Sequence, residues 1–241
     1  MNLLKNLLRS IKWSIAKNKT LFWILFPPDN LLKFEYANYA ELQTWKFVKD
    51  QLKDYSSLCE IGCFNGRIPM ILIKSLKQKR YVGFDLNFVA ILIAKFLNFF
   101  KNFKNYRNLT FHSKRGVYAS KENCELFVSV ATFIYFSEIE LIRFIDLIKI
   151  NKSFKALILH EIFLNEKISQ SNKTLTDKDI NIHSISMIKK RFGKNYDIEV
   201  KRTFYPNWEK EDRISAILYI KINKSRNMPK IGIVFLIRTS K

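Results

Sequence analysis

The 241-residue chain contains little cysteine, glycine or proline, with three, six and five residues respectively. The cysteines, Cys59, Cys63 and Cys124, are odd in number and lack the spacing of a zinc site, and no histidine near the first two completes a ligand set. A disulfide framework and a metal site are therefore not expected. We predict reduced, buried cysteines in a cytoplasmic protein.

The chain also lacks long apolar runs. Residues 21–26 are apolar, but this stretch stops at Pro27 and Pro28, far short of the roughly 18 residues that a spanning helix needs. No small-residue cleavage site follows it. The sequence therefore predicts neither a signal peptide nor a transmembrane anchor.

Acidic residues are outnumbered two to one, since 21 Asp and Glu accompany 42 Lys and Arg, for a net charge of +21. Such a charge attracts nucleic acid phosphates or an anionic membrane face. Lysine, asparagine, isoleucine and phenylalanine are abundant, however, and an AT-rich genome produces this bias without any anionic partner. Both explanations stay open. The hydrophobic fraction of 48% is sufficient for the packed core of one domain.

No acid occurs in the first 28 residues, where leucine and isoleucine recur at helical spacing opposite lysine and arginine. The pattern predicts a basic amphipathic extension over residues 1–33. Either residues 1–26 lie in the headgroup region of a membrane, which would place the protein on the inner membrane face, or their apolar side caps the domain core.

The rest of the chain alternates strand and helix patterns. Apolar runs bounded by turn residues predict strands at 57–61, 81–84, 108–112, 126–130 and 156–162. Helical periodicity predicts helices at 34–52, 68–76, 88–99 and 138–148. Repeated β-α-β alternation predicts an α/β fold with a Rossmann-like, doubly wound, mostly parallel sheet.

The end of the sequence predicts a different arrangement. After a polar stretch at 170–178 we expect a helix to about residue 191, with Gly193 as its cap. Strands at 197–205 and 214–221 would form a C-terminal antiparallel hairpin and complete a seven-stranded sheet. The predicted domain spans 34–222, and 223–241 form a tail or an extra strand at 231–237.

Gly62 and Gly66 lie in the turn between the first predicted strand and its helix, where glycine lets the backbone approach a ligand. Asp85 ends the second strand 19 residues beyond Gly66, the spacing of an acid that binds ribose hydroxyls. The two features predict a nucleotide-like ligand at the carboxyl edge of the sheet. Alternatively, the glycines only permit a tight turn, Asp85 caps the next helix, and Glu60 is a solvated charge.

The turn does not fit a dinucleotide. Aligning the second glycine of G-x-G-x-x-G with Gly62 puts Glu60 and Asn65 at the other two glycine positions. A carboxylate is also unfavourable beside a pyrophosphate, whereas Glu60 attracts a sulfonium and an ammonium. A sulfonium cofactor is therefore favoured over NAD.

The ordered set Glu60-x-Gly62-x-x-x-Gly66 and Gly83-Phe84-Asp85 resembles the first motif and the strand-two acid of the class I S-adenosylmethionine-dependent methyltransferases. The resemblance covers residues 55–221, and the phrase Cys59 to Gly62 is also similar to bacterial sugar O-methyltransferases. It implies S-adenosyl-L-methionine as the cofactor. Glu60, Gly62 and Gly66 would line its methionine part, and Asp85 would bind its ribose.

The resemblance implies four further cofactor contacts. Leu86 would face the adenine, and Ser113 would substitute for the family's acid at the end of the third strand, which is missing here. Ala131 and Thr132, in the loop after the fourth strand, would flank the transferred methyl group.

The sequence lacks the motifs of enzymes that methylate two classes of acceptor. The loop at 131–136 has neither the Asn- or Asp-Pro-Pro-aromatic sequence typical of adenine N6 methylation nor the cysteine nucleophile of pyrimidine C5 methylation. Oxygen, or another nitrogen or carbon, remains as the acceptor atom. Methylation of a hydroxyl needs either a base or a metal to remove the proton, and His160, Glu161 and His183 are the candidate bases, although a histidine often has only a structural role.

We therefore predict methyl transfer to a hydroxyl of a small molecule, sugar or glycan. An RNA methyltransferase, favoured by the net charge alone, and a non-catalytic Rossmann-like binding protein are the alternatives. Nucleic acid is the less favoured partner.

Overall fold

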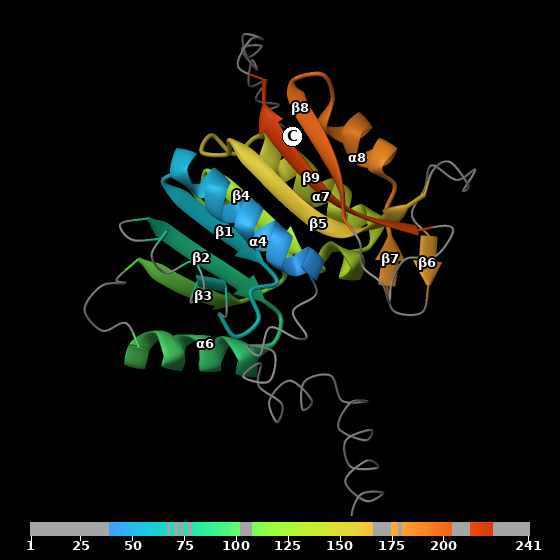
Figure 1. The fold of residues 1–241 in the computed structure, drawn as a ribbon. Helices are drawn as coiled ribbons and strands as arrows, with labels where there is room; N and C mark the ends of the chain where they lie inside the picture. Colours follow the sequence, from blue (N-terminus) through green and yellow to red (C-terminus); the bar gives the residue numbers. More distant parts are fainter. Residues whose placement is uncertain are drawn as a thin grey trace, which may run out of the picture.

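The computed structural model describes residues 39–66, 68–69, 72, 75–76, 79–101, 108–165, 175–177, 180–203 and 213–223. Figure 1 shows one large sheet with helices on both faces and a small separate hairpin. The predicted extension at 1–33 and the strand candidate at 231–237 lie outside the described residues. No helix among the described residues is long and apolar enough to cross a membrane.

The large sheet has seven strands in the order β3-β2-β1-β4-β5-β9-β8. Its parallel part contains β1 (Ser57–Ile61), β2 (Arg80–Asp85), β3 (Leu109–Ser113), β4 (Leu126–Val130) and β5 (Ala156–Leu164). The antiparallel hairpin consists of β8 (Tyr196–Thr203) and β9 (Arg213–Ile222). The predicted fold class is confirmed.

The register of the sheet aligns the carboxyl ends of its central strands. Ile61 of β1 is level with Phe84 of β2 and with Ser129 of β4. The strand order also reverses between β1 and β4, and open α/β sheets bind ligands at such a reversal. The turn after β1 and the loop after β4 therefore emerge side by side at a position suited to a ligand.

Helices bury both faces of the sheet, as strands buried along their whole length require. On one face, α4 (Tyr39–Gln51) and α6 (Phe88–Lys101) contribute Trp45, Val48 and Ile91 to a buried cluster. On the other, α7 (Glu138–Lys149) and α8 (Ile185–Phe192) contribute Phe144 and Ile188. Cys59, Cys63 and Cys124 are free and buried between these layers.

The helices on the second face have side-chain caps. At α7 the Glu140 amide donates to Ser137 Oγ, and Ser137 N donates to Glu140 Oε2 at 3.0 Å. At α8 the Met187 amide donates to Ser184 Oγ at 3.2 Å. Gly193 ends α8 with φ of 77°, so its predicted capping role is confirmed.

The sequence interpretation was wrong between residues 175 and 184. Instead of a polar stretch running into a helix, β6 (Leu175–Asp177) and β7 (Ile180–Ile182) form a hairpin, and α8 begins only at Ile185. Strands of three residues are too short to give a period of two in the sequence. β5 also continues two residues beyond its predicted end because it pairs with β9 as far as Leu164 and Arg213.

Two predicted helices are described only in part. Within 68–76, Leu72 N donates to Ile68 O and Leu76 N donates to Leu72 O, both at 2.9 Å, which is the spacing of an α-helix. In the predicted helix 34–52, the described part is α4, followed by a short 3₁₀ turn at Leu52–Asp54.

Candidate cofactor and acceptor site

The turn after β1 depends on a left-handed backbone. Gly62 has φ of 82° and Gly66 has φ of 73°, a region in which glycine pays no steric penalty. Phe64 has φ of 47° although it is not glycine. The amides of Gly62 and Cys63 donate to the Phe84 carbonyl at 2.7 and 3.0 Å, which anchors the turn to β2.

Asp85 joins this turn to the end of β2. Its Oδ2 accepts from Phe64 N at 3.0 Å, and its Oδ1 accepts from Asn87 N at 2.8 Å. Burial raises the pKa of the Asp85 carboxyl, and the amide hydrogen bonds from Asn87, Phe64 and Leu86 oppose that shift. Because an ionised carboxylate has about four acceptor sites, Asp85 retains capacity for a ligand.

The edge beside Asp85 is open. Leu86 is 69% exposed, and Ser113, the register partner of Asp85 on β3, is also exposed. The sequence resemblance implies that these two residues contact the adenine. The structure places them at the same edge of the sheet as Asp85.

Glu60 lies inside the protein beneath the turn. It is 3% exposed, and its Oε2 accepts from the Tyr81 hydroxyl at 2.5 Å. It is therefore not a solvated strand-end charge, and that alternative is wrong. Asn65 of the turn is also buried, and its Oδ1 has no hydrogen-bond partner among the described residues.

The loop after β4 packs directly against the turn. Ala131 has φ of 51°, a conformation that costs a non-glycine residue about 1–2 kcal/mol. Thr132 N donates to Glu161 Oε1 at 3.0 Å, and Thr132 Oγ1 donates to the Val130 carbonyl at 3.1 Å. The Thr132 side chain lies over Gly62, where a Cβ on the glycine would be 2.8 Å from Thr132 Cβ.

Glu161 holds that loop through one of its two carboxyl oxygens. Besides the Thr132 amide, Oε1 accepts from Phe133 N at 3.0 Å and from Ser129 Oγ at 2.9 Å. Oε2 has no hydrogen-bond partner among the described residues, and the side chain is only 4% exposed. Burial raises the pKa of Glu161 to about 7, although hydrogen bonds from the amides of Phe133, Thr132 and Ile134 and from the Ser129 hydroxyl favour its ionised form.

His160 points to the opposite face of β5, as alternation along a strand requires. Its Nδ1 bonds to Thr44 Oγ1 of α4 at 2.7 Å, and its Nε2 lies 3.1 Å from Thr203 Oγ1 and 3.2 Å from Ser215 Oγ. Burial lowers the pKa of His160 to about 4. The ring is thus neutral near pH 7, with both nitrogens engaged by hydroxyl groups.

His183 lies between β7 and α8, and it is 2% exposed. Its Nε2 lies 3.0 Å from the Phe133 carbonyl, to which it donates in the tautomer protonated at Nε2. Burial lowers the pKa of His183. The contact joins the short 3₁₀ turn at Phe133–Tyr135, whose Phe133 amide donates to Glu161, to the segment between β7 and α8.

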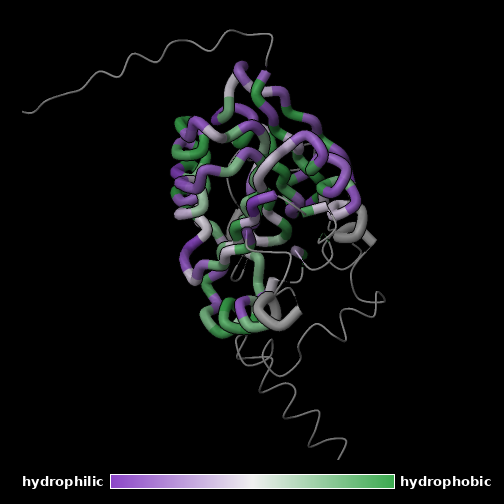
Figure 2. The backbone as a smooth tube through the Cα atoms, turned by 90° about the vertical axis from the view of Figure 1, so that its left-hand side faces the viewer, coloured by the Kyte–Doolittle hydropathy of each residue, from purple (hydrophilic) through white to green (hydrophobic). Residues whose placement is uncertain are grey.

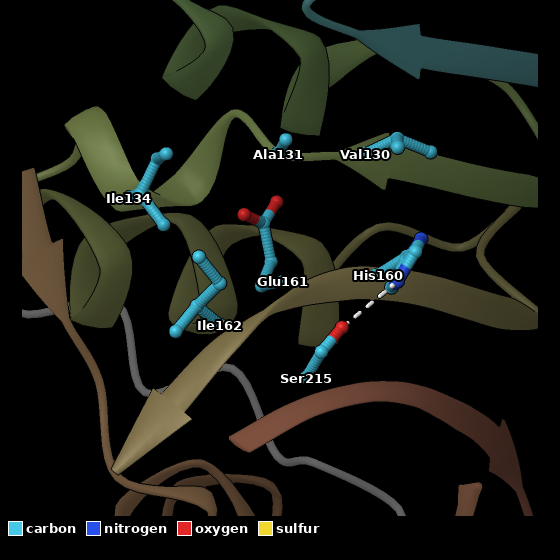
Figure 3. A pocket seen from close by; sticks show the side chains of 7 residues that line it. All are labelled: Val130, Ala131, Ile134, His160, Glu161, Ile162 and Ser215. Atoms are coloured by element: carbon cyan, nitrogen blue, oxygen red, sulfur yellow. Dashed lines mark hydrogen bonds between the residues drawn. The ribbon is translucent and has the colours of Figure 1, made fainter. Parts of the chain in front are cut away.

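A pocket lies between the loop after β4 and the strands β5 and β9 (Figure 3). It contains about 310 Å³ of space, part of it open to solvent, and its lining residues are Val130, Ala131, Ile134, His160, Glu161, Ile162 and Ser215. In Figure 3 the Glu161 carboxylate points toward the gap between Ala131 and Ile134. Across the described part of the chain, no group of three or more His, Cys, Asp and Glu residues could hold a metal ion.

Sequence reasoning missed three residues of this arrangement: Tyr81, Phe64 and Ser129. Tyr81 bonds Glu60, the Phe64 amide bonds Asp85, and Ser129 bonds Glu161. Strand alternation could have placed Ser129 on the face shared with Phe127, but no sequence signal identifies its partner. The positive φ of Phe64 has no sequence signature either.

No protein-family model matches the sequence, and no curated protein is significantly similar to it. Solved structures are similar in fold. The O-methyltransferase from the trans-AT PKS multienzyme of Brevibacillus brevis, in complex with S-adenosyl-L-homocysteine, superposes with a TM-score of 0.59 at 12% identity, over 85% of this chain and 80% of that one.

Magnesium protoporphyrin IX methyltransferase from Synechocystis PCC 6803, with bound S-adenosylmethionine, gives a TM-score of 0.54 at 16% identity, over 77% of this chain and 85% of that one. The chain has the class I methyltransferase fold. The small RNA methyltransferase HEN1 contains this fold within a larger protein, with a TM-score of 0.56 at 14% identity, over 78% of this chain and 26% of that one.

Proposed function

We propose that this protein is an S-adenosylmethionine-dependent methyltransferase. The observation that carries the proposal is the link between Asp85 and Phe64. It sets a carboxylate with spare acceptor capacity beside a glycine turn, at the switch point of the class I methyltransferase fold. The similar structures with bound cofactor or S-adenosylhomocysteine support this reading of the fold.

The residues around the turn fit the cofactor. The buried Asn65 Oδ1, which has no partner within the described part of the chain, and the half-buried Asp85 carboxylate offer acceptors to ammonium and hydroxyl groups. Glu60, Gly62 and Gly66 would line the methionine part, and Asp85 would bind the ribose. Glu60 supplies negative charge from beneath the turn, which favours a cationic ligand.

The adenine and the transferred methyl group would lie at the same carboxyl edge of the sheet. Leu86 and Ser113, both exposed, would flank the adenine. Ala131 and Thr132 would lie beside the methyl group, and because Thr132 already touches Gly62, the methionine part would lie next to this contact. When bound, S-adenosylmethionine supplies a methyl group from its sulfonium and leaves as S-adenosylhomocysteine.

Calorimetry with S-adenosylhomocysteine tests the proposal. Wild-type protein should bind, and Asp85→Ala should weaken binding at least tenfold, as expected when a charge-assisted hydrogen bond is lost. Glu199→Ala, an exposed acid on β8 far along the sheet, is the matched control and should bind as wild type does. Absence of binding to folded wild-type protein would refute the proposal and favour a different role for the fold.

The acceptor that we propose is a hydroxyl of a small molecule, sugar or glycan. The support is the mostly apolar pocket beside the loop after β4, and this loop lacks the sequence of an adenine N6 enzyme. An RNA acceptor is the alternative, supported by the charge of +21. Methyl transfer from labelled cofactor to separated RNA, glycan and metabolite fractions decides between them.

We also propose peripheral membrane contact at the cytoplasmic face through residues 1–26, which lie outside the described residues. A described surface supports it, because Phe88, Leu92 and Phe96 of α6 are each between 47% and 61% exposed. Figure 2 shows α6, at the bottom of the view, as mostly hydrophobic. Flotation of the full chain on anionic vesicles should exceed that of a chain without residues 1–26, and should fall with salt.

A further inference from the structure

We propose that Glu161 accepts the hydrogen bond of the methyl acceptor and that this acceptor is a small, uncharged molecule that presents one hydroxyl to an otherwise apolar pocket. The inference rests on the proposed methyltransferase function. It names a catalytic side chain and a substrate class for that same site.

The two oxygens of the Glu161 carboxyl group have different surroundings. Three donors, two of them backbone amides, converge on Oε1 and fix the orientation of the side chain. Oε2 has no hydrogen-bond partner among the described residues, although the side chain is 4% exposed. A buried acceptor without a partner is costly, so this geometry favours a donor that arrives with a ligand.

The lining of the pocket is mostly apolar, because it includes Val130, Ala131, Ile134 and Ile162. The other polar side chains, His160 and Ser215, are bonded to each other and to Thr203. Glu161 Oε2 is therefore the acceptor that the lining offers to a ligand.

The negative charge of the Glu161 carboxylate restricts which ligands the pocket favours. A carboxylate in an apolar wall repels a phosphate or a carboxylate and favours a neutral donor, because the described lining residues include neither lysine nor arginine and the lining His160 is neutral near pH 7. A phosphodiester is thus a poor occupant. The small volume also favours a compact acceptor or one projecting group of a larger one.

A purely structural role for Glu161 would need only Oε1, which supports the loop at Thr132 and Phe133. That role leaves Oε2 unexplained. In the catalytic role, Oε2 would take the hydroxyl proton while the acceptor oxygen gains the methyl group that S-adenosylmethionine supplies when bound. The sulfur–methyl bond would break, S-adenosylhomocysteine would leave, and Glu161 would later return the proton to solvent. His160 and His183 are less suitable, since His160 has both ring nitrogens engaged and His183 supports the Phe133 carbonyl.

Two matched probes, phenol and anisole, test the inference on full-length protein saturated with S-adenosylhomocysteine. Phenol offers a hydroxyl donor and anisole offers only an ether oxygen, while both present the same apolar ring. At pH 8.5, NMR titration of wild-type protein should show phenol binding about tenfold more tightly than anisole. In Glu161→Gln, the amide retains an acceptor for the three loop donors but presents N–H groups to the pocket, so the preference should disappear or reverse.

Each outcome bears on the inference. Equal phenol and anisole affinities in wild-type protein, no phenol binding at all, or an unchanged preference in a folded Glu161→Gln protein would each overturn it. If that variant does not fold, Glu161→Asp, which shortens the carboxylate, should reduce the preference instead. Failure of wild-type protein to bind S-adenosylhomocysteine would refute the proposed function itself, which separates the two failures.

Discussion

Thr132 lies directly over Gly62, so that a Cβ on the glycine would be 2.8 Å from the Cβ of the threonine. The contact joins the turn after β1 to the loop after β4, two segments that are far apart in the sequence. Gly62 is therefore required twice, once for its φ of 82° and once for the space that Thr132 occupies. Glu161 maintains the contact by binding the Thr132 amide.

Gly62→Ala should destabilise the protein more than Gly193→Ala. Both glycines have positive φ, but nothing lies within 4 Å of a Cβ on Gly193. Gly193→Ala should thus cost about 1–3 kcal/mol from backbone strain, and Gly62→Ala should add about 1–3 kcal/mol from overpacking. Urea denaturation measures both. The additional loss of unfolding free energy in Gly62→Ala, relative to Gly193→Ala, should shrink when Thr132→Gly is combined with it. An unchanged additional loss would mean that Thr132 is not its cause.

Glu161→Gln should change how stability depends on pH. Because the pKa of Glu161 is about 7 in the folded protein and near 4.5 when unfolded, its protonation stabilises the fold fully below pH 4.5. This contribution, about 3 kcal/mol, is lost as pH rises to about 7. The difference between wild-type and Glu161→Gln unfolding free energies should therefore fall across this range.

The comparison with the variant is needed because the contribution of His160 to the unfolding free energy changes with pH in the opposite direction. Its pKa falls from 6.5 to about 4 on folding, so its contribution is present above pH 6.5 and is lost as pH falls toward 4. His183 and Asp85 also titrate with shifted pKa values, but Glu161→Gln leaves them in place. A difference curve that is flat from pH 4.5 to 7 would contradict the assignment.

His160→Leu should lower the free energy of unfolding by about 2–4 kcal/mol, because it removes the hydrogen bonds that the ring makes with the hydroxyl groups of Thr44, Thr203 and Ser215 inside the protein. His112→Phe is the matched control, since the His112 ring stacks on Phe84 at 5.0 Å and an aromatic ring preserves that contact. Its effect should be much smaller. Equal losses in the two variants would show that the His160 network contributes little.

Phe88→Ser combined with Phe96→Ser should reduce flotation on anionic vesicles severalfold, since both side chains are 61% exposed on α6. The matched control is Ile139→Ser with Ile150→Ser, two exposed apolar residues at the ends of α7. That pair should leave flotation unchanged. If both pairs have the same effect, general hydrophobicity rather than the α6 surface is responsible.

The sequence predicted the sheet well because its strands are short apolar runs separated by helices with a clear period. β1 and β4 have the predicted bounds. The hairpin of β6 and β7 was missed because three-residue strands carry no periodic signal. Tertiary pairing with β9, which no local pattern contains, lengthened β5.

For the site, the sequence located residues but not their contacts. Asp85 and the glycine turn were placed correctly relative to the sheet, because motif order along parallel strands determines the edge at which they meet. Three candidate bases could not be ranked from the sequence. Only the partners of His160, Glu161 and His183 distinguish a ring with both nitrogens engaged from a carboxylate that has one oxygen without a partner among the described residues.

The position of β9 inside the sheet has a consequence for synthesis on the ribosome. β5, which carries His160 and Glu161, pairs with β4 on one side and with residues 213–221 on the other. Until those residues emerge, β5 is an open edge with unpaired backbone groups, the kind of edge that invites aggregation. A nascent chain that stalls before Arg213 can complete the glycine turn but not the pocket, so the acceptor side is the last part of the molecule to form.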